Sequence, residues 1–155
     1  IEDSDYLVLS PGVRQDIPPV QWAKAAHIPV LGEIEFGFLF CRAPIIAVTG
    51  SNGKTTTKEM LAKILGMRGP VLKTEGNLNN QIGLPLTLLR LKKEHQAAVL
   101  EMGISRPCDM RLLCDIAKPT MGIITNIGAA HLEFLGNMQG VADEKTVLFE
   151  ALPPN

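Results

Sequence analysis

A short apolar run that breaks into a glycine-rich loop is the feature that most constrains this chain. Residues 45–48 read IIAV, which is typical of a buried strand, and residues 50–55 continue as GSNGKT. A helical pattern over residues 56–65 follows the loop. A strand, a glycine loop and the start of a helix form a cradle for phosphate, because backbone N–H groups and the positive end of the helix dipole both favour an anion. The stretch therefore predicts a nucleotide site.

Two polar residues of this loop have expected roles. The Lys54 ammonium is expected to reach the outer phosphates, and the Thr55 hydroxyl is expected to hold Mg²⁺. The generic motif has a further glycine five residues before Gly53, where this chain has Val48. An ordinary turn into a helix is the alternative interpretation.

Composition favours a globular chain with a focused binding site. Of the 155 residues, 46% are hydrophobic, which supports a buried core. The net charge is only −1, so no broad attraction to nucleic acid or to a membrane surface is expected. No apolar run reaches the length of a membrane span, and we expect no membrane insertion.

The termini and the cysteines indicate the setting of the chain. The three cysteines, Cys41, Cys108 and Cys114, are odd in number and form no CxxC motif, which favours structural thiols in a reducing, cytoplasmic compartment. The first residue is Ile1 rather than Met, which indicates a processed, excised or incompletely represented chain.

Strands and helices alternate along the whole sequence, which predicts an α/β fold with a parallel sheet. The expected strands are residues 6–9, 28–31, 45–48, 71–73, 97–100 and 121–125, and the expected helices are residues 21–26, 56–65, 86–91, 110–117 and 141–152. The order of elements restarts after Pro44. We therefore expect residues 1–42 to end one α/β domain and residues 43–155 to begin a second, which contains the glycine loop.

Polar residues follow several of these strands, and ligands of open α/β sheets bind beyond the carboxyl ends of strands. Glu101 ends the run 97–100, and a buried carboxylate there needs a partner such as Mg²⁺. A salt-bridged or capping glutamate is the alternative. His131 also follows a strand, although a lone histidine is more often structural. Ser10-Pro11-Gly12 lies at the first strand end, where a plain turn is the alternative.

Two further segments have open interpretations. Residues 74–85 are rich in amides, which suits either a ligand loop or a surface loop. Lys145 lies in the last helical run, where its default interpretation is a solvated surface lysine. Asp109 precedes the run 110–117 as an expected helix cap.

Five segments together resemble the Mur ligases, which form amide bonds with ATP in peptidoglycan precursor synthesis and thereby support cell shape and division. They are VTGSNGKTTTKEML, TEGNLNNQIGLPLTLL, LEMG, ITNIGAAHLEFLG and GVADEKTVLFEAL, in the order of the family. From residue 43 to residue 152 the chain most resembles the branch that adds D-alanyl-D-alanine to a UDP-MurNAc-tripeptide. Residues 1–36 instead resemble the end of the first domain of the D-glutamate-adding branch.

The resemblance implies a role for individual residues. The ATP phosphates are expected at Gly50, Ser51, Asn52, Gly53, Lys54, Thr55 and Thr56. One Mg²⁺ is expected at Thr55 and Glu101, and a second at His131. Lys145 aligns with the lysine that is carbamylated in this family, and a carbamate would turn this cation into an anion that takes part in metal binding. An ordinary lysine is the alternative. The UDP-sugar side of the substrate is expected at Thr74, Asn77, Asn79 and Asn80, and the uridine diphosphate is expected at Ser10, Pro11 and Gly12.

The implied reaction converts a carboxylate into an acyl phosphate, which an incoming amino acid or dipeptide then attacks. Catalytic roles are expected for Lys54, Glu101, His131 and Lys145. Members of the family carry further sequence for the adenine and the amine, so we expect a monomeric ligase core that does not complete ligation alone. The alternatives are a D-glutamate ligase, a folate-polyglutamate ligase and a non-catalytic nucleotide-binding module. Cys108 replaces a usual glycine of the family, and the resemblance gives it no role.

Overall fold

The computed structural model describes residues 4–10, 13–32, 36 and 43–154. The chain divides into two compact units, residues 1–42 and 43–155, and each is described by itself. No helix in the described residues is long and apolar enough to cross a membrane.

The first unit contains a strand–helix–strand motif made of β1 (Leu7–Leu9), α1 (Pro18–Ala25) and β2 (Val30–Gly32). Helix α1 starts with two prolines, which lose no hydrogen bond there because the first N–H groups of a helix have no acceptor within it. The helix buries Val20 and Ala23. Strands β1 and β2 pair in parallel, as the sequence predicts.

Part of the first predicted substrate loop lies outside the described residues. Pro11 and Gly12 are not among them. Ser10 is described, and its carbonyl accepts a hydrogen bond from the Val13 N–H.

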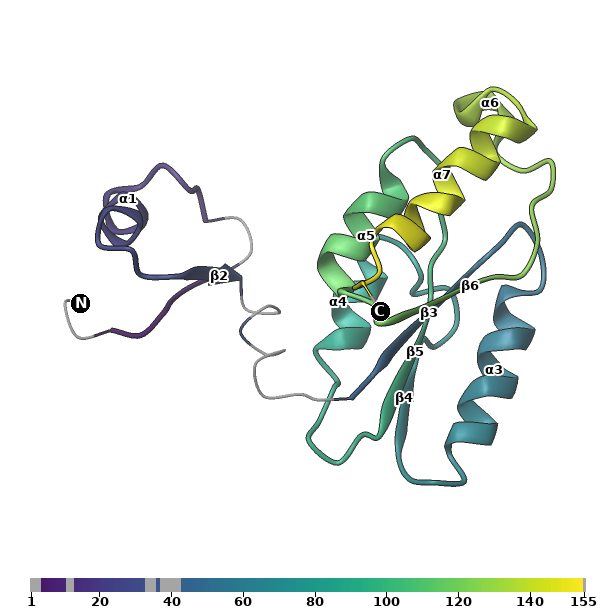
Figure 1. Cartoon of the computed structure of the whole chain (residues 1–155), viewed down its shortest axis with the longest axis horizontal. Helices are drawn as coiled ribbons and strands as arrows, with labels where there is room; N and C mark the ends of the chain where they lie inside the picture. Colours follow the sequence, from purple (N-terminus) through teal and green to yellow (C-terminus); the bar gives the residue numbers. More distant parts are fainter. Residues whose placement is uncertain (1–3, 11–12, 33–35, 37–42, 155) are drawn as a thin grey trace. The chain divides into compact units, whose positions relative to one another are not determined.

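The second unit is built on a four-stranded parallel sheet in the order β4-β5-β3-β6 (Figure 1). The strands are β3 (Ile45–Thr49), β4 (Val71–Lys73), β5 (Ala97–Glu101) and β6 (Met121–Ile124). Every residue of β3 and β5 is buried, which suits the central strands of a parallel sheet covered on both faces. The predicted α/β class with a parallel sheet is confirmed.

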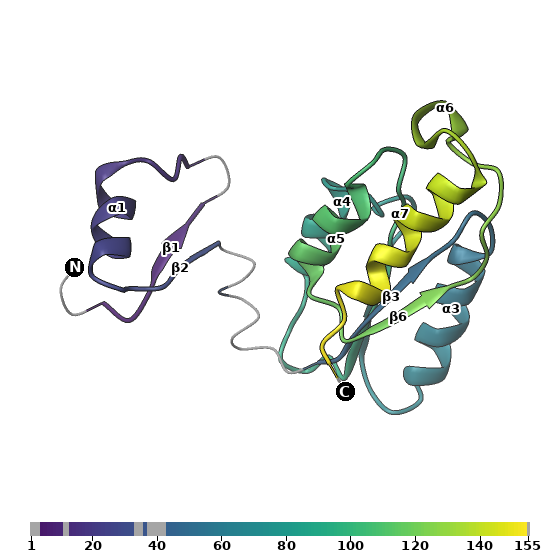
Figure 2. The same ribbon diagram turned by 45° about the horizontal axis from the view of Figure 1, so that its top comes forward.

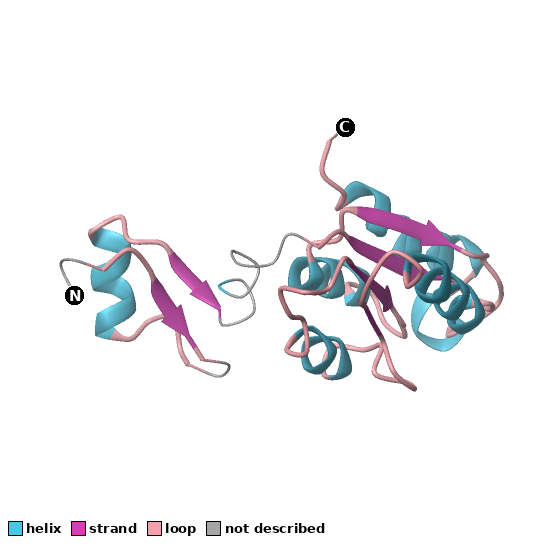
Figure 3. Cartoon of the chain, turned by 90° about the horizontal axis from the view of Figure 1, so that it is seen from below, coloured by secondary structure: helices cyan, strands magenta, loops and turns pink. Residues whose placement is uncertain are grey.

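Helices cover both faces of this sheet (Figures 2 and 3). On one face, α3 (Lys54–Leu65) packs Leu61, Ala62 and Leu65 against a core cluster of Ile46, Val48 and Val99. The other face carries α5 (Asp109–Ala117) and α7 (Met138–Glu150), with α4 (Gly83–Leu88) against α5. The short helix α6 (Leu132–Leu135) precedes α7 and is absent from the sequence prediction.

Asparagine side chains before the first turn explain why two helices begin earlier than predicted. Helix α4 begins at Gly83 rather than at residue 86, because the Asn80 Oδ1 accepts hydrogen bonds from the Ile82 and Gly83 N–H groups. Helix α7 begins at Met138 rather than at residue 141, because Asn137 caps it through the Gly140 N–H.

The prediction that Asp109 caps α5 is wrong. The N-cap is Cys108, and Asp109 is the first helical residue. The Asp109 carboxylate instead accepts hydrogen bonds from the Ser105 and Arg106 N–H groups, which fixes the loop before the helix. The predicted strand 28–31 is also shifted, to Val30–Gly32, because the Ile28 N–H still donates to the Ala23 carbonyl at the end of α1.

Candidate active site

The carboxyl ends of three neighbouring strands meet at the glycine loop. In the register of the sheet, Val48 of β3 lies beside Glu101 of β5, and Thr49 lies beside Ile124 of β6. The residues that follow these strands therefore converge at one edge of the sheet, as expected for the ligand side of a parallel α/β fold.

The glycine loop adopts backbone angles that suit glycine. Gly53 has a φ of 79° and Gly50 has a φ of 149°. A Cβ atom on Gly50 would lie 2.0 Å from the Thr125 Oγ1, so the loop approaches the end of β6 more closely than a larger residue permits. The Lys54 Nζ donates to the Gly50 carbonyl at 2.9 Å and lies over the loop.

The segment after β6 braces the first half of the loop. The backbone carbonyl of Asn126 accepts a hydrogen bond from the Ser51 N–H at 3.1 Å. The side-chain Oδ1 of Asn126 accepts one from the Asn52 N–H at 2.8 Å. The Ser51 hydroxyl donates to the Gly128 carbonyl. Because two of the amides already have acceptors, a direct role of Ser51 and Asn52 in phosphate binding stays a prediction.

The second half of the loop presents amides to an incoming anion. Helix α3 has no side-chain cap at Gly53, and no described residue accepts from the N–H groups of Gly53, Lys54, Thr55 or Thr56. These donors lie at the positive end of a helix of 12 residues. This geometry suits a phosphate group.

The Glu101 carboxylate is held on both oxygens at the start of this helix. Its Oε2 accepts from the Thr55 Oγ1 at 2.9 Å, and its Oε1 accepts from the Asn79 Nδ2 at 2.9 Å. The Glu101 N–H donates to the Thr74 Oγ1. The residue is only 3% exposed, and the Lys58 Nζ lies 3.9 Å from its Oε2.

This donor set fits a magnesium ion. Mg²⁺ in phosphate-binding sites typically takes one or two protein oxygens and completes its shell with water and phosphate. The Thr55 hydroxyl and the Glu101 carboxylate are hard oxygen donors in direct contact with one another. Within the described residues no group of three or more His, Cys, Asp and Glu side chains could hold a metal. The second predicted metal site stays a prediction.

A cavity of about 280 Å³ joins the glycine loop to two residues that lie far along the chain. Lys54, His131 and Lys145 all line it, so the structure brings together three of the four predicted catalytic residues. Glu101 does not line the cavity directly but holds Asn79, which does. The remaining lining residues are Gly50, Ser51, Asn80, Gly103, Ile104, Ser105 and Ala130.

Lys145 is buried, and the default interpretation of a solvated surface lysine is wrong. The residue is 2% exposed, and no described residue forms a hydrogen bond or ion pair with its side chain. Burial lowers the Lys145 pKa from 10.5 to about 8, the nearby Lys54 contributes to the shift, and Glu144 opposes it. A substantial share of this amine is therefore neutral under mildly basic conditions.

The predicted substrate residues lie in three different settings. Asn79 and Asn80 line the cavity. Thr74 is fully buried, where its hydroxyl supports Glu101 and its carbonyl accepts from Lys58. Asn77 is exposed outside the cavity lining. Their contacts with a substrate stay a prediction.

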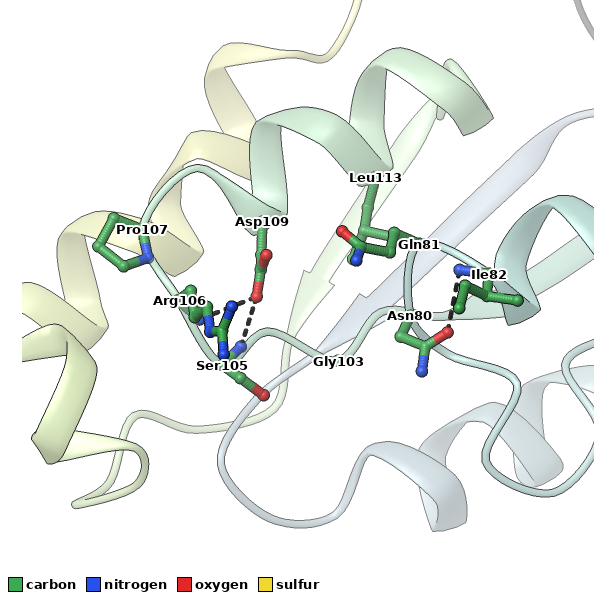
Figure 4. A pocket seen from close by; sticks show the side chains of 9 residues that line it. All are labelled: Asn80, Gln81, Ile82, Gly103, Ser105, Arg106, Pro107, Asp109 and Leu113. Atoms are coloured by element: carbon green, nitrogen blue, oxygen red, sulfur yellow. Dashed lines mark hydrogen bonds between the residues drawn. The ribbon is translucent and has the colours of Figure 1, made fainter. Parts of the chain in front are cut away.

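A second hollow, of about 460 Å³, adjoins the first (Figure 4). It shares Asn80, Gly103 and Ser105 with the cavity, so the two spaces are adjacent along one edge of the sheet. In the close-up, residues 80–82 lie on one side, and residues 105–107 with the start of α5 lie on the other. A ligand that reaches from the glycine loop toward α5 has room here.

Sequence reasoning missed three residues that organise the site. Lys58 is a buried cation next to Glu101, Asn126 braces the glycine loop, and Glu144 accepts from the Cys108 and Met110 N–H groups at the start of α5. Lys58 carries a detectable signal, because it lies one helical turn after Lys54 and so shares its face. The partners of Glu144 are distant backbone groups, which no sequence pattern reveals.

The family model of the Mur ligase middle domain matches residues 48–155. The UDP-N-acetylmuramoyl-tripeptide–D-alanyl-D-alanine ligase of Synechocystis is 50% identical over 111 residues, which are 72% of this chain and 24% of the relative. The ligase of the same name from Bacillus subtilis is 48% identical over 108 residues, which are 70% of this chain and 24% of the relative.

Solved structures agree with the sequence relatives. This chain is similar to a structure of MurF from Acinetobacter baumannii, with a TM-score of 0.70 and 43% identity. The aligned region covers 74% of this chain and 25% of the MurF chain. It is also similar to MurF from Thermotoga maritima in complex with ADP, with a TM-score of 0.70 and 28% identity. That alignment covers all of this chain and 43% of the MurF chain. The chain spans about a quarter of the length of the curated relatives it matches. The resemblance in the sequence is thus confirmed, and the chain belongs to the Mur ligase family.

Proposed function

We propose that this chain is the phosphate-binding part of an ATP-dependent ligase of the MurF type, which joins D-alanyl-D-alanine to a UDP-MurNAc-tripeptide. The observation that carries the proposal is the position of Lys54 and Lys145 in one cavity, next to the Thr55–Glu101 pair. A module that only binds a nucleotide has no need of a buried, partly neutral lysine opposite the phosphate loop.

The chemistry needs charge neutralisation more than a covalent group on the protein. Transfer of the ATP γ-phosphoryl group to the substrate carboxylate gives an acyl phosphate, and the amine then displaces phosphate. Lys54 and the free amides at the start of α3 would hold the phosphates in line. Thr55 and Glu101 would hold Mg²⁺, which offsets the negative charge of the phosphates when it is bound.

Lys145 is the proposed site of carbamylation. A lysine reacts with carbon dioxide only as the neutral amine, which then loses a proton to form a carbamate. Burial and Lys54 favour that neutral amine by lowering the Lys145 pKa to about 8. The resulting anion would share the cavity with Lys54 and His131, and with His131 it would help hold a second Mg²⁺.

The substrate would approach from the side of the asparagine loop. Thr74, Asn77, Asn79 and Asn80 would serve the UDP-sugar side of the substrate. A separate role, at the uridine diphosphate, is proposed for Ser10, Pro11 and Gly12. Residues 1–42 would end the substrate-binding domain and residues 43–155 would begin the ATP-binding domain. We further propose that the ligase is a cytoplasmic monomer.

Nucleotide binding tests the proposal directly. Isothermal titration of the 155-residue chain with ADP and Mg²⁺ is expected to show weak binding, which Lys54→Met reduces by about tenfold or more because a charged hydrogen bond to phosphate is lost. Lys63→Met removes an exposed lysine from the same helix and is the matched control. Equal affinities of the two variants would reject the phosphate site.

Substrate competition separates the two branches of the family. Tighter binding of a UDP-muramoyl tripeptide than of UDP-muramoyl-alanine is expected for the D-alanyl-D-alanine branch. The opposite order would support the D-glutamate branch. The 155-residue chain is expected to form no amide product with ATP, the UDP-tripeptide and D-alanyl-D-alanine, so a measured product would contradict its assignment as a ligase core.

A further inference from the structure

We infer that Lys58 is a positioning residue that acts as a built-in counter-ion for Glu101, so that the carboxylate is held in place before a metal binds and the metal affinity is lowered in return. This inference rests on the proposed function, because it takes Thr55 and Glu101 as the magnesium ligands. Lys58 itself does not line the cavity of the glycine loop.

The burial of Lys58 is the first observation. The residue is 1% exposed, although lysine is almost never fully buried without a partner. A buried ammonium is costly unless hydrogen bonds and opposite charge compensate for the lost water. The partners of Lys58 therefore show what holds the charge at this position.

Three oxygens surround the Lys58 Nζ. It donates to the Thr74 carbonyl at 2.7 Å, lies 3.1 Å from a carboxylate oxygen of Glu59, and lies 3.9 Å from the Glu101 Oε2. Glu59 is half-exposed, whereas Glu101 is buried. Among these partners, only Glu101 is a buried charge, so it depends most on the ammonium for compensation.

These contacts belong to a polar network around the Glu101 carboxylate. Lys58 holds the Thr74 carbonyl, and the Thr74 hydroxyl accepts from the Glu101 N–H. The Glu101 Oε2 accepts from Thr55, which precedes Lys58 by one turn of α3. One helix thus approaches the same oxygen with a hydroxyl and a cation.

The same polar network predicts that Lys58 and a metal ion compete for the Glu101 carboxylate. A divalent cation at the Thr55–Glu101 pair would share the charge of one carboxylate with the Lys58 ammonium, and the two cations would repel each other. Among the described residues, loss of the ammonium leaves the Glu101 carboxylate with two neutral donors, Thr55 and Asn79. Without the metal, the variant protein is then less stable than the wild type. Binding of the metal is expected to raise the stability of the variant more than that of the wild type.

The experiment follows the thermal unfolding of the 155-residue chain as MgCl₂ is raised at constant ionic strength, without nucleotide. Lys58→Met is expected to unfold at a lower temperature without Mg²⁺ and to show an apparent Mg²⁺ dissociation constant about tenfold lower than that of the wild type, because a unit charge a few ångströms away repels a divalent ion to about that extent even in water. Lys58→Arg keeps the charge and is expected to keep the wild-type response.

Two further variants separate charge from packing. Lys63→Met removes an exposed charge from the same helix and is expected to leave the Mg²⁺ response unchanged. Lys58→Gln keeps a donor for Thr74 without the charge, and it is expected to bind Mg²⁺ more tightly than the wild type even where Lys58→Met does not fold.

Each outcome decides the inference. If the wild type responds to Mg²⁺ and both uncharged variants respond equally or less, Lys58 has only a structural role and the inference fails while the magnesium site stands. If no chain responds, the inference and the magnesium part of the proposed function fail together.

Discussion

Lys145 of α7 and Lys54 of α3 line the same cavity, and the charge of Lys54 adds to burial in lowering the Lys145 pKa to about 8. Two ammonium groups that face one space favour an anion between them. The same arrangement destabilises the folded protein whenever Lys145 is charged, because its pKa is 10.5 in the unfolded chain.

Replacement of Lys145 by methionine is expected to stabilise the protein at pH 7 by about 1–3 kcal/mol. Below pH 8 the folded and unfolded states both hold the proton, so the wild type carries the full cost of the buried charge. Between pH 8 and 10.5 the unfolded chain binds the proton more often, so the stability of the wild type rises toward that of the variant. Urea unfolding in buffers free of carbon dioxide measures the difference, and a difference that does not change with pH would contradict the assignment.

Replacement of Glu144 by glutamine is expected to destabilise the protein by about 1–2 kcal/mol. The Glu144 carboxylate accepts from the Cys108 N–H at 3.0 Å and from the Met110 N–H at 2.8 Å, whereas an amide offers only one accepting atom. Glu150→Gln changes an exposed charge at the end of the same helix and is the control. Equal unfolding midpoints for the two variants would show that the hydrogen bonds accepted by Glu144 contribute nothing to stability.

Replacement of Cys108 by glycine is expected to stabilise the protein by about 0.5–1 kcal/mol. Cys108 has a φ of 70°, which is unfavourable for a residue with a Cβ atom, and the gain is reduced because glycine makes the unfolded chain more flexible. Cys108→Ala removes the thiol but keeps the Cβ atom, so chemical denaturation is expected to show no gain. Stabilisation by alanine as large as by glycine would exclude backbone strain as the cause.

Replacement of Gly50 by alanine is expected to cost at least about 2 kcal/mol. The new Cβ atom would lie 2.0 Å from the Thr125 Oγ1, whereas a Cβ atom on Gly76, also at positive φ, meets no atom within 4 Å. Gly76→Ala, at a φ of 53°, measures the cost of alanine at a left-handed position without a clash, about 1–2 kcal/mol, whereas the φ of 149° at Gly50 adds backbone strain of its own. The loss in Gly50→Ala is expected to shrink in a Thr125→Ala background, and strictly additive effects would show that the close contact does not matter.

The sequence predicts the fold well because the signals of this chain are local. A short continuous apolar run that ends in a glycine loop, such as residues 45–48, is typical of a central strand of a parallel sheet, and β3 is found there. The boundaries of α4 and α7 were less predictable, because the Asn80 and Asn137 side chains decide where these helices start. A cap of this kind depends on a side-chain rotamer, which the apolar pattern does not reveal.

The candidate site is only partly predictable for a different reason. The pairing of Thr55 with Glu101 follows from the meeting of two strand ends at one edge of the sheet. The burial of Lys145 does not follow from its neighbours in the sequence, because it depends on how α7 packs on the sheet. The burial of Lys58 is equally unpredictable from the sequence, because a lysine in an amphipathic helix is most often solvated.

The hydrogen bonds between Asn126 and the glycine loop connect the loop to the segment that precedes His131. The segment that accepts from the amides of Ser51 and Asn52 continues to His131, which is the N-cap of α6 and also lines the cavity. A bound phosphate that shifts the backbone at Ser51 or Asn52 is therefore expected to shift Asn126 as well, in the segment that leads to His131.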